Sequence, residues 1–345
     1  MPEQPPESDL LIPLPGPEDS WDPHLVHTHY FGCCVPEAQL GAYTYIRYQP
    51  AFPLCQAGVV IFQGKDNPTL LDATYVDYQI TLPWPEVDGA AITTANGLRM
   101  EFPEPGRRAL ISYQSGDGTT RVNLEATAVT PLAARGHVMP SEAAGRTQES
   151  GGSEQFMRYT GEIVVRGDVF AVDCHYPRDR SWRQVRPESA DANAHPPLTW
   201  TPVYFDEQFA FNQVGMEAPD TDPIWADAYQ LPSGAPTHHF AWVARNGEIR
   251  DIVRVHRNVT ELHPVMSIPL RMEIEAEDTA GEIYQLSGEA IACSVLPAWP
   301  NLAGFDSVFR WEDANGRVAH GPAQSIWSHR VQQIIKARRS AAGVR

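Results

Sequence analysis

Long apolar runs, paired cysteines and lysine are all scarce in this sequence of 345 residues. No stretch approaches the roughly 20 apolar residues of a membrane-spanning helix, so we expect no membrane insertion. The five cysteines form no CxxC pair, which argues against a disulfide framework and a structural zinc site. The N-terminus, MPEQPPESDL, has neither the basic nor the apolar region of an export signal. We therefore expect a reduced, cytoplasmic protein.

Motifs for nucleotide binding and serine hydrolysis are also missing, since no GxGxxG, P-loop or GxSxG pattern occurs. Acidic residues outnumber basic ones by 43 to 26, and this net charge of −17 disfavours nucleic acid and anionic membranes as partners. The adjacent His238 and His239 would face opposite sides of a strand, and His27 and His29 lack a nearby carboxylate. We expect no metal and no cofactor.

Strand and turn residues are abundant, with 31 prolines and 25 glycines. Short runs rich in β-branched and aromatic residues, such as YTYIRYQ and AGVVIFQ, alternate with turn signals. Residues 85–95 are either a weak helix or a loop, and residues 137–153 predict a mobile loop. The segment HRVQQIIKARRSAAGVR predicts one short helix that then frays.

An internal repeat predicts two domains, which the length also allows at roughly 100–200 residues each. LRMEF in the first half matches LRMEI in the second, and similar strand-like segments follow both in the same order. Chance similarity between antiparallel meanders is the alternative. We predict a duplicated β-barrel or curved β-sandwich with its boundary at 187–202. The expected parts are a disordered tail 1–20, domains 21–190 and 200–335, and a frayed tail 336–345.

The densest polar cluster follows the strand-like segment FAVDCHY. Alternation places Asp173 and His175 on one face, and Pro177 should end regular pairing, so the next residues form an Arg-Asp-Arg turn. Nearby arginines would lower the pKa of Asp179, whereas an apolar cavity would raise it, and the sequence leaves both possible. The cluster is either an acid site or a staple of Arg–carboxylate pairs that joins the barrel to the adjoining domain.

The segment HYPRDRSWRQVR resembles the H-x-x-R-D-x-S-W-G-x-R signature of AttH-like proteins. This two-domain lipocalin-like superfamily includes the carotenoid 1,2-hydratases (hydroxyneurosporene synthases) and some pericyclases. Arg183 stands where the signature has glycine. The resemblance implies an all-β fold of two lipocalin-like barrels in tandem. In the hydratases an aspartate protonates an isoprenoid double bond, a role that by position falls to Asp179 or Asp173.

We therefore predict a cofactor-independent enzyme, a lyase of hydratase type or an isomerase or cyclase, acting on an apolar terpenoid or polyketide-like substrate inside a barrel cavity. Asp179 or Asp173 would donate the proton, with His175 setting its protonation and Arg178 fixing its geometry. Aromatic faces would stabilise a carbocation. The side chains predicted to line the pocket are Trp182, Tyr45, Trp84, Tyr204, Phe211, Trp225 and Trp242.

Two alternatives stay open. The first is a carrier that binds a hydrophobic ligand without catalysis, and the second is a pericyclase that works by preorganising its substrate. In all three cases the expected partner is a small hydrophobic molecule.

Overall fold

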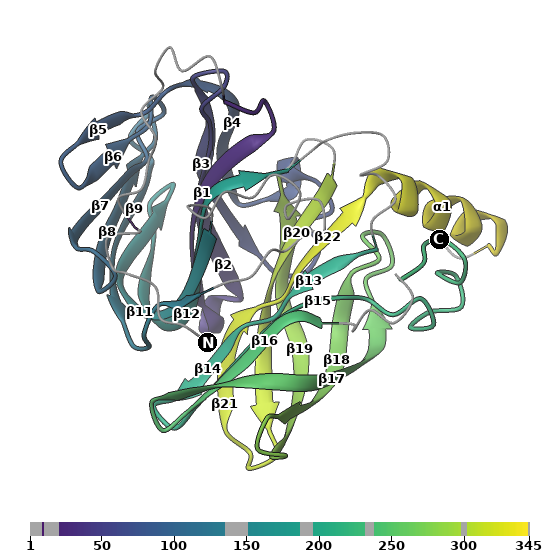
Figure 1. Cartoon of the computed structure of the whole chain (residues 1–345). Helices are drawn as coiled ribbons and strands as arrows, with labels where there is room; N and C mark the ends of the chain where they lie inside the picture. The colour runs from purple at the N-terminus through teal and green to yellow at the C-terminus, as the bar shows by residue number, and fades with distance from the viewer. Residues whose placement is uncertain are drawn as a thin grey trace. The chain divides into compact units, whose positions relative to one another are not determined.

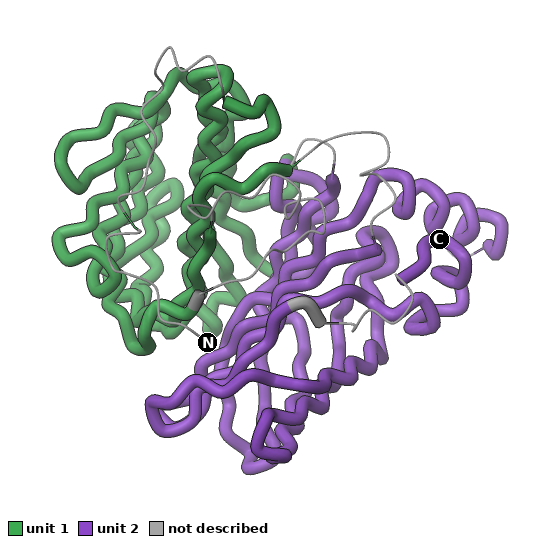
Figure 2. Tube along the Cα trace, in the orientation of Figure 1, with its two compact units in different colours: residues 1–64, 71–187 green, residues 65–70, 188–345 purple. Residues whose placement is uncertain are grey.

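The structure is a computed structural model that describes residue 9 and residues 21–134, 151–186, 196–231, 238–297 and 302–343. Most of these residues belong to two large curled antiparallel sheets (Figure 1). The predicted all-β fold of two lipocalin-like barrels with a short C-terminal helix is confirmed. The chain divides into two compact units, residues 1–64 with 71–187 and residues 65–70 with 188–345 (Figure 2).

The sheet of unit 1 is a meander whose last strand returns to pair with its first. The strand order is β4-β3-β2-β1-β12-β11-β9-β8-β7-β6-β5, with β10 on β11. The strands are β1 (Leu25–Val35), β2 (Leu40–Gln49), β3 (Leu54–Gln63), β4 (Tyr75–Pro83), β5 (Glu86–Asp88), β6 (Ala91–Thr93), β7 (Arg99–Glu104), β8 (Arg108–Gln114), β9 (Thr120–Ala128), β10 (Ala133–Ala134), β11 (Gly151–Val165) and β12 (Asp168–Val185). Two 3-10 turns, η2 (Pro36–Ala38) and η3 (Leu70–Asp72), join strands of this region.

The sheet of unit 1 curls so strongly that strands far apart in it contact each other across one of its faces. Phe31 and His29 of β1 contact Phe102 of β7, with ring centroids 6.2 and 5.4 Å apart, although four strands separate β1 from β7 in the sheet. Tyr75 of β4 and Tyr113 of β8 likewise lie 6.0 Å apart. We call this enclosed face the inner face of unit 1 and the opposite one its outer face.

The sheet of unit 2 closes into a ring, because β13 pairs with both β15 and β22. Closure leaves fewer exposed strand edges. Its strands are β13 (Leu198–Trp200), β14 (Val203–Asp206), β15 (Phe209–Met216), β16 (His238–Arg245), β17 (Glu248–Leu262), β18 (Pro269–Asp278), β19 (Ile283–Leu296), β20 (Leu302–Asp313), β21 (Val318–Pro322) and β22 (Gln324–Ser328). Helix α1 (His329–Ala341) follows β22 and buries Val331 and Ile335 in the core of this unit. It is neither long nor apolar enough to span a membrane, and it is the one α-helix among the described residues.

Three local predictions need correction. Most of the segment 85–95 is neither helix nor loop, because residues 86–93 form the hairpin β5–β6, turned at Gly89, whose φ of 58° suits glycine. The C-terminal helix does not fray at 336. It continues to Ala341 because Arg338 donates hydrogen bonds to the carbonyls of Ile224 and Ala226 in the same unit. Residues 151–153 of the predicted loop 137–153 begin β11.

Several other predicted features lie wholly or partly outside the described residues. These are the tail 1–20 apart from Asp9, the loop residues 137–150, and residues 187–195 of the proposed boundary. Residues 65–70 belong to unit 2, where the side chain of Asn67 donates to the carbonyl of Cys293 at 3.0 Å. All five cysteines are free thiols.

Candidate functional site

Strand β12 does not end at Pro177, so the prediction of an Arg-Asp-Arg turn is wrong. Pro177 lies opposite Phe156 of β11. The backbone of Phe156 makes no hydrogen bond to Pro177, because its N–H donates to the Thr130 hydroxyl and its C=O accepts from the Val129 N–H. The proline nitrogen therefore points toward β1, and pairing between β12 and β1 stops one residue away, at Arg178. Because no ladder bond is needed there, the strand runs on through the whole polar cluster.

A continuous strand sends alternate side chains to opposite faces, and this divides the cluster. Arg178 and Arg180 are buried on the inner face of unit 1, whereas Asp179 points to the outer face and is half-buried. The two arginines that flank Asp179 in sequence therefore do not surround it in space. The carboxylate that pairs with Arg178 belongs to Asp9, with Nη1 and Oδ1 2.6 Å apart.

Asp179 therefore does not face the interior of the barrel, and the prediction that it acts inside a barrel cavity is wrong. On the outer face, Asp179 belongs to one row of residues in register across six strands. Each residue is the cross-strand partner of the next, so their side chains share a face. The row consists of Glu154 (β11), Asp179 (β12), Tyr30 (β1), Tyr45 (β2), Gly58 (β3) and Tyr78 (β4). We call it the carboxyl–tyrosine row.

The acidic end of the row holds two carboxyl groups on neighbouring strands. Glu154 lies directly opposite Asp179 and is only 3 % exposed. Adjacent carboxyl groups are an arrangement used in acid–base catalysis, where one group can hold a proton beside the other. Sequence reasoning missed Glu154 because it lies beside the stretch expected to be a loop. The sequence around Asp179 does not indicate that a glutamate lies opposite it on the neighbouring strand.

The other end of the row is aromatic and buried. The ring centroids of Tyr30 and Tyr45 lie 6.5 Å apart, and Tyr43 stacks on Tyr30 at 6.2 Å. Burial raises the pKa of Tyr45, and the charge of Asp179 adds to that effect, while Arg186 and Arg47 oppose it. Tyr45 therefore keeps its hydroxyl proton at neutral pH and can donate a hydrogen bond.

Gly58 keeps the row free of a side chain between Tyr45 and Tyr78. A Cβ atom at Gly58 would lie 1.8 Å from the carbonyl oxygen of Asp77, so only glycine lets β4 approach this closely. The Tyr78 hydroxyl is buried and has no hydrogen-bond partner among the described residues. Burial raises its pKa, so it too stays protonated.

The other predicted catalytic residues lie away from Asp179. Asp173 is 63 % exposed, and hydrogen bonds from Arg158 at 2.9 Å hold its pKa below the usual range, which keeps it ionised. His175 is half-buried, and burial lowers its pKa. Four residues of extended strand place His175 about 13 Å from Asp179, so the two side chains cannot touch. The strand thus brings Asp173 and His175 together, as predicted, but not with Asp179.

The predicted aromatic residues of unit 1 lie on both faces. Tyr45 belongs to the carboxyl–tyrosine row, and Trp84 packs on Tyr48 at 5.7 Å. Trp182 lies near the guanidinium of Arg180, 5.8 Å from ring centroid to Cζ, beside a bulge of β12. At that bulge Arg183, the residue that replaces the glycine of the AttH-like signature, has a φ of 50°, a conformation that favours glycine.

The predicted aromatic residues of unit 2 are divided in the same way. Phe211 and Trp225 belong to its apolar core. Trp242 is the cross-strand partner of Asn212, which accepts a hydrogen bond from the Trp200 indole at 3.0 Å. Tyr204 is buried but outside that core.

The inner face of unit 1 carries two buried histidines. The His29 ring is 3.0 Å from the Tyr48 hydroxyl, and burial together with the charge of Arg180 lowers the pKa of His29 well below its usual value. Burial and the charges of Arg180 and Arg183 do the same for His27. Both histidines are therefore neutral in the folded protein near pH 6.

Unit 1 is expected to lose stability in mild acid because of these two histidines. Below the unfolded pKa of about 6.5 the unfolded chain takes up protons that the folded chain cannot, so stability falls as pH falls. At pH 5.5 the loss is about 1.4 kcal/mol for each histidine. Urea unfolding at pH 7.5 and 5.5 measures it. His29→Gln should reduce the loss by about 1.4 kcal/mol, whereas the exposed His256→Gln should leave it unchanged. An equal loss in wild type and His29→Gln contradicts this account.

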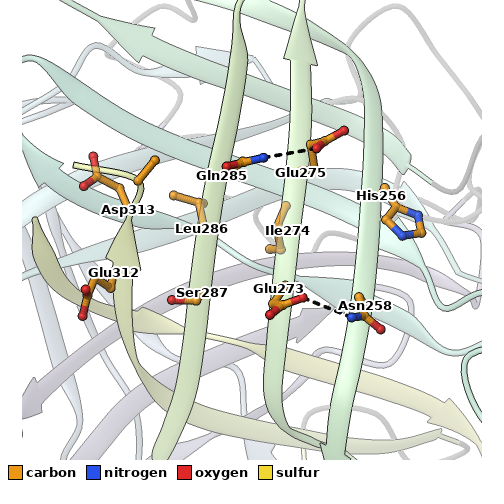
Figure 3. A pocket seen from close by; sticks show the side chains of 11 residues that line it. His256, Asn258, Glu273, Ile274, Glu275, Gln285, Leu286, Ser287, Glu312 and Asp313 are labelled. Carbon is orange, nitrogen blue, oxygen red and sulfur yellow. Dashed lines mark hydrogen bonds between the residues drawn. The ribbon is translucent and has the colours of Figure 1, made fainter. Parts of the chain in front are cut away.

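Unit 2 has an open groove of about 420 Å³ over β17, β18 and β19 (Figure 3). Its side chains are mostly polar, and all four of its carboxylates already accept hydrogen bonds. Glu273 accepts from Asn258 at 3.1 Å and Glu275 from Gln285 at 3.4 Å. This lining does not suit an apolar substrate. Among the described residues, no three His, Cys, Asp or Glu side chains are placed to hold a metal ion. The predicted absence of a metal stays a prediction.

Comparisons with known proteins bear on the fold. The crystal structure of a candidate AttH protein from Nitrosomonas europaea is similar with a TM-score of 0.54 and 11% sequence identity, over 88% of this chain and 92% of that one. That likeness supports an AttH-like fold. Kievitone hydratase from Nectria haematococca is similar with a TM-score of 0.49 and 12% identity, over 89% and 90% of the two chains.

At the level of sequence, no curated protein matches this chain. A family profile matches residues 15–328, which is most of its length. The chain therefore belongs to the family described as a domain of unknown function, DUF7064.

Proposed function

We propose that the protein is a lyase of hydratase type that adds water to, or removes it from, an apolar substrate at the carboxyl–tyrosine row. Asp179 is the residue that transfers the proton, and Glu154 is its neighbouring carboxyl group. The substrate is a small polyene of terpenoid or polyketide-like character.

The proposal rests on the carboxyl–tyrosine row. A carboxyl pair and three tyrosines stand side by side on one face of a sheet, and Glu154, Tyr30 and Tyr45 are at most 5 % exposed. Protonating an alkene needs an acid on one side and an environment that tolerates a carbocation on the other. Carboxyl groups supply the first, and tyrosine ring faces supply the second through cation–π attraction.

Asp179 gives up one proton in the proposed reaction and regains one at its end. The Asp179 carboxyl group gives its proton to one alkene carbon, which leaves a carboxylate and a carbocation on the neighbouring carbon. A water molecule attacks that carbon and forms the new C–O bond. The oxonium then returns a proton to the Asp179 carboxylate, so the acid is restored after each turnover. Dehydration is the same path in reverse.

Tyr30 and Tyr45 position the substrate in this scheme. Tyr30 lies on β1, the strand next to Asp179, and Tyr45 lies on β2, one strand further. A flat unsaturated segment laid along the row therefore meets aromatic faces and the acid together. The protonated Tyr45 hydroxyl can bind the oxygen that water delivers. Aromatic walls and one polar anchor are typical of small-molecule sites.

Turnover of a substrate panel by the full-length protein tests the proposal. The panel consists of acyclic and cyclic polyenes with the corresponding tertiary alcohols, and mass spectrometry measures the products. We expect at least one pair whose members differ by one water to interconvert. Tight binding without turnover would favour the carrier, and a product of unchanged mass would favour the pericyclase.

A further inference from the structure

A carboxylate is held inside unit 1 by a site that uses three different donor groups. Arg178 Nη1 and Nη2 donate to the Asp9 carboxylate at 2.6 and 3.2 Å, and the Gly106 N–H donates to it at 2.6 Å. The side chains of Arg178 and Asp9 are 2 % and 1 % exposed. A bidentate guanidinium with a backbone N–H is strong, directional carboxylate recognition.

The donors are held in place by groups other than Asp9. Gln155 accepts from Arg178 Nε at 2.9 Å, and its amide donates to the carbonyls of Gly106 and Thr130 at 2.9 and 2.8 Å. One side chain thus ties the guanidinium to the peptide that supplies the N–H. Such a prepared site binds its ligand with little ordering cost.

Asp9 itself is bound like a ligand. It lies 97 positions before Gly106 and 169 before Arg178 in the chain, so no local chain geometry brings it to these donors. Its carbonyl oxygen is 3.3 Å from His29 Nε2, so both its side chain and its backbone contact the inner face.

The surroundings of the site are apolar and aromatic. The Arg178 Cζ atom lies 5.8 Å from the ring centroid of Phe31, and Phe31 contacts Phe102 at 6.2 Å. A ligand that takes the place of Asp9 therefore meets a charged anchor at one end and aromatic rings beside it. This combination fits an acid with an apolar body rather than a polar anion such as phosphate.

We propose that Arg178, Gly106 and Gln155 form a binding site for the carboxylate of an apolar acid, and that Asp9 is an internal competitor that occupies it. The site lies on the inner face of unit 1, whereas the carboxyl–tyrosine row lies on the outer face. Arg178 and Asp179 are neighbours in sequence but serve different sites. The inference therefore stands or falls independently of the proposed function.

Fluorescence titration with cis-parinaric acid and with its methyl ester tests the site in the full-length protein. Asp9→Ala removes the competitor, so this variant should bind the acid at least tenfold more tightly than wild type, with ester binding unchanged. Asp22→Ala, a change at an exposed carboxylate of the same region, should bind the acid like wild type. Asp9→Ala combined with Arg178→Met should lose the preference for acid over ester.

Stability provides a second readout, because Asp9→Ala leaves the Arg178 charge buried without a carboxylate. The acid should raise the Tm of this variant more than that of wild type, and the ester should not, since a ligand stabilises the state that binds it. If Asp9→Ala fails to fold without ligand, Asp9→Asn takes its place in both measurements. Equal affinities of wild type and variant for the acid, or equal affinities of the variant for acid and ester, would overturn the proposal.

Discussion

Asp179→Asn is expected to lower kcat/KM for hydration of the substrate by about 10²–10⁴-fold, the usual contribution of a general acid. The amide has nearly the same shape as the carboxyl group but cannot give up a proton to carbon. Because the row is otherwise unaltered, KM should change by less than about threefold, so the loss falls on kcat. Steady-state kinetics on the substrate that the panel identifies measures both quantities.

Asp173→Asn is the matched comparison for this variant. It makes the same chemical change six residues earlier on β12, at an exposed carboxylate paired with Arg158. Its effect on kcat/KM should be below about twofold, because an exposed ion pair contributes little. Glu154→Gln should give an intermediate loss, since it removes the neighbour of the acid but leaves the acid. Equal losses for Asp179→Asn and Asp173→Asn would contradict the assignment of the proton donor to Asp179.

Arg257→Met is expected to reduce the free energy of unfolding of unit 2 by about 3–5 kcal/mol, the cost of breaking a buried pair. The Arg257 guanidinium lies 2.8 Å from Glu217 Oε1, and the two side chains are only 7 % and 2 % exposed. Burial raises the pKa of Glu217, and Arg257 opposes that rise. Without the arginine, Glu217 must either stay charged at a buried position or take up a proton. Urea unfolding at pH 7.5 measures the loss.

The loss of stability in Arg257→Met is expected to depend on pH. An acid whose folded pKa is raised costs stability as pH increases above its unfolded pKa, so the deficit should shrink between pH 7.5 and pH 5. Adding Glu217→Gln should recover most of the loss, because no charge is then buried. Arg254→Met on the same strand breaks only exposed pairs with Glu275 and Glu277 and should cost less than about 1 kcal/mol. A pH-independent deficit that Glu217→Gln does not reduce would point to lost packing instead.

Much of the fold could be predicted from the sequence because its cause is local. Alternating apolar residues bounded by turn residues specify a strand wherever they occur, and this pattern recurs in both units. The hairpin at Gly89 was missed because β5 and β6 have only three residues each, too few for alternation to show. The end of α1 was misjudged because carbonyls of residues 224 and 226, far away in the chain, bind Arg338.

The site was harder to predict because its members meet through strand register. Alternation correctly put Asp173 and His175 on one face, but the effect of Pro177 depended on where pairing with β1 stops, which local sequence does not encode. For the same reason, the local sequence did not indicate the partners of Asp179 and Arg178. Asp179 meets Glu154 across β11, and Arg178 meets Asp9 from the far end of the chain.

The most direct test of acid-catalysed hydration at the carboxyl–tyrosine row is deuterium incorporation in D2O. Protonation of an alkene carbon by the Asp179 carboxyl group, whose proton exchanges with solvent, predicts one carbon-bound deuterium per product molecule. Asp179→Asn should form this product at no more than about one hundredth of the wild-type rate. A product without solvent deuterium at carbon, formed equally fast by wild type and Asp179→Asn, would contradict the account.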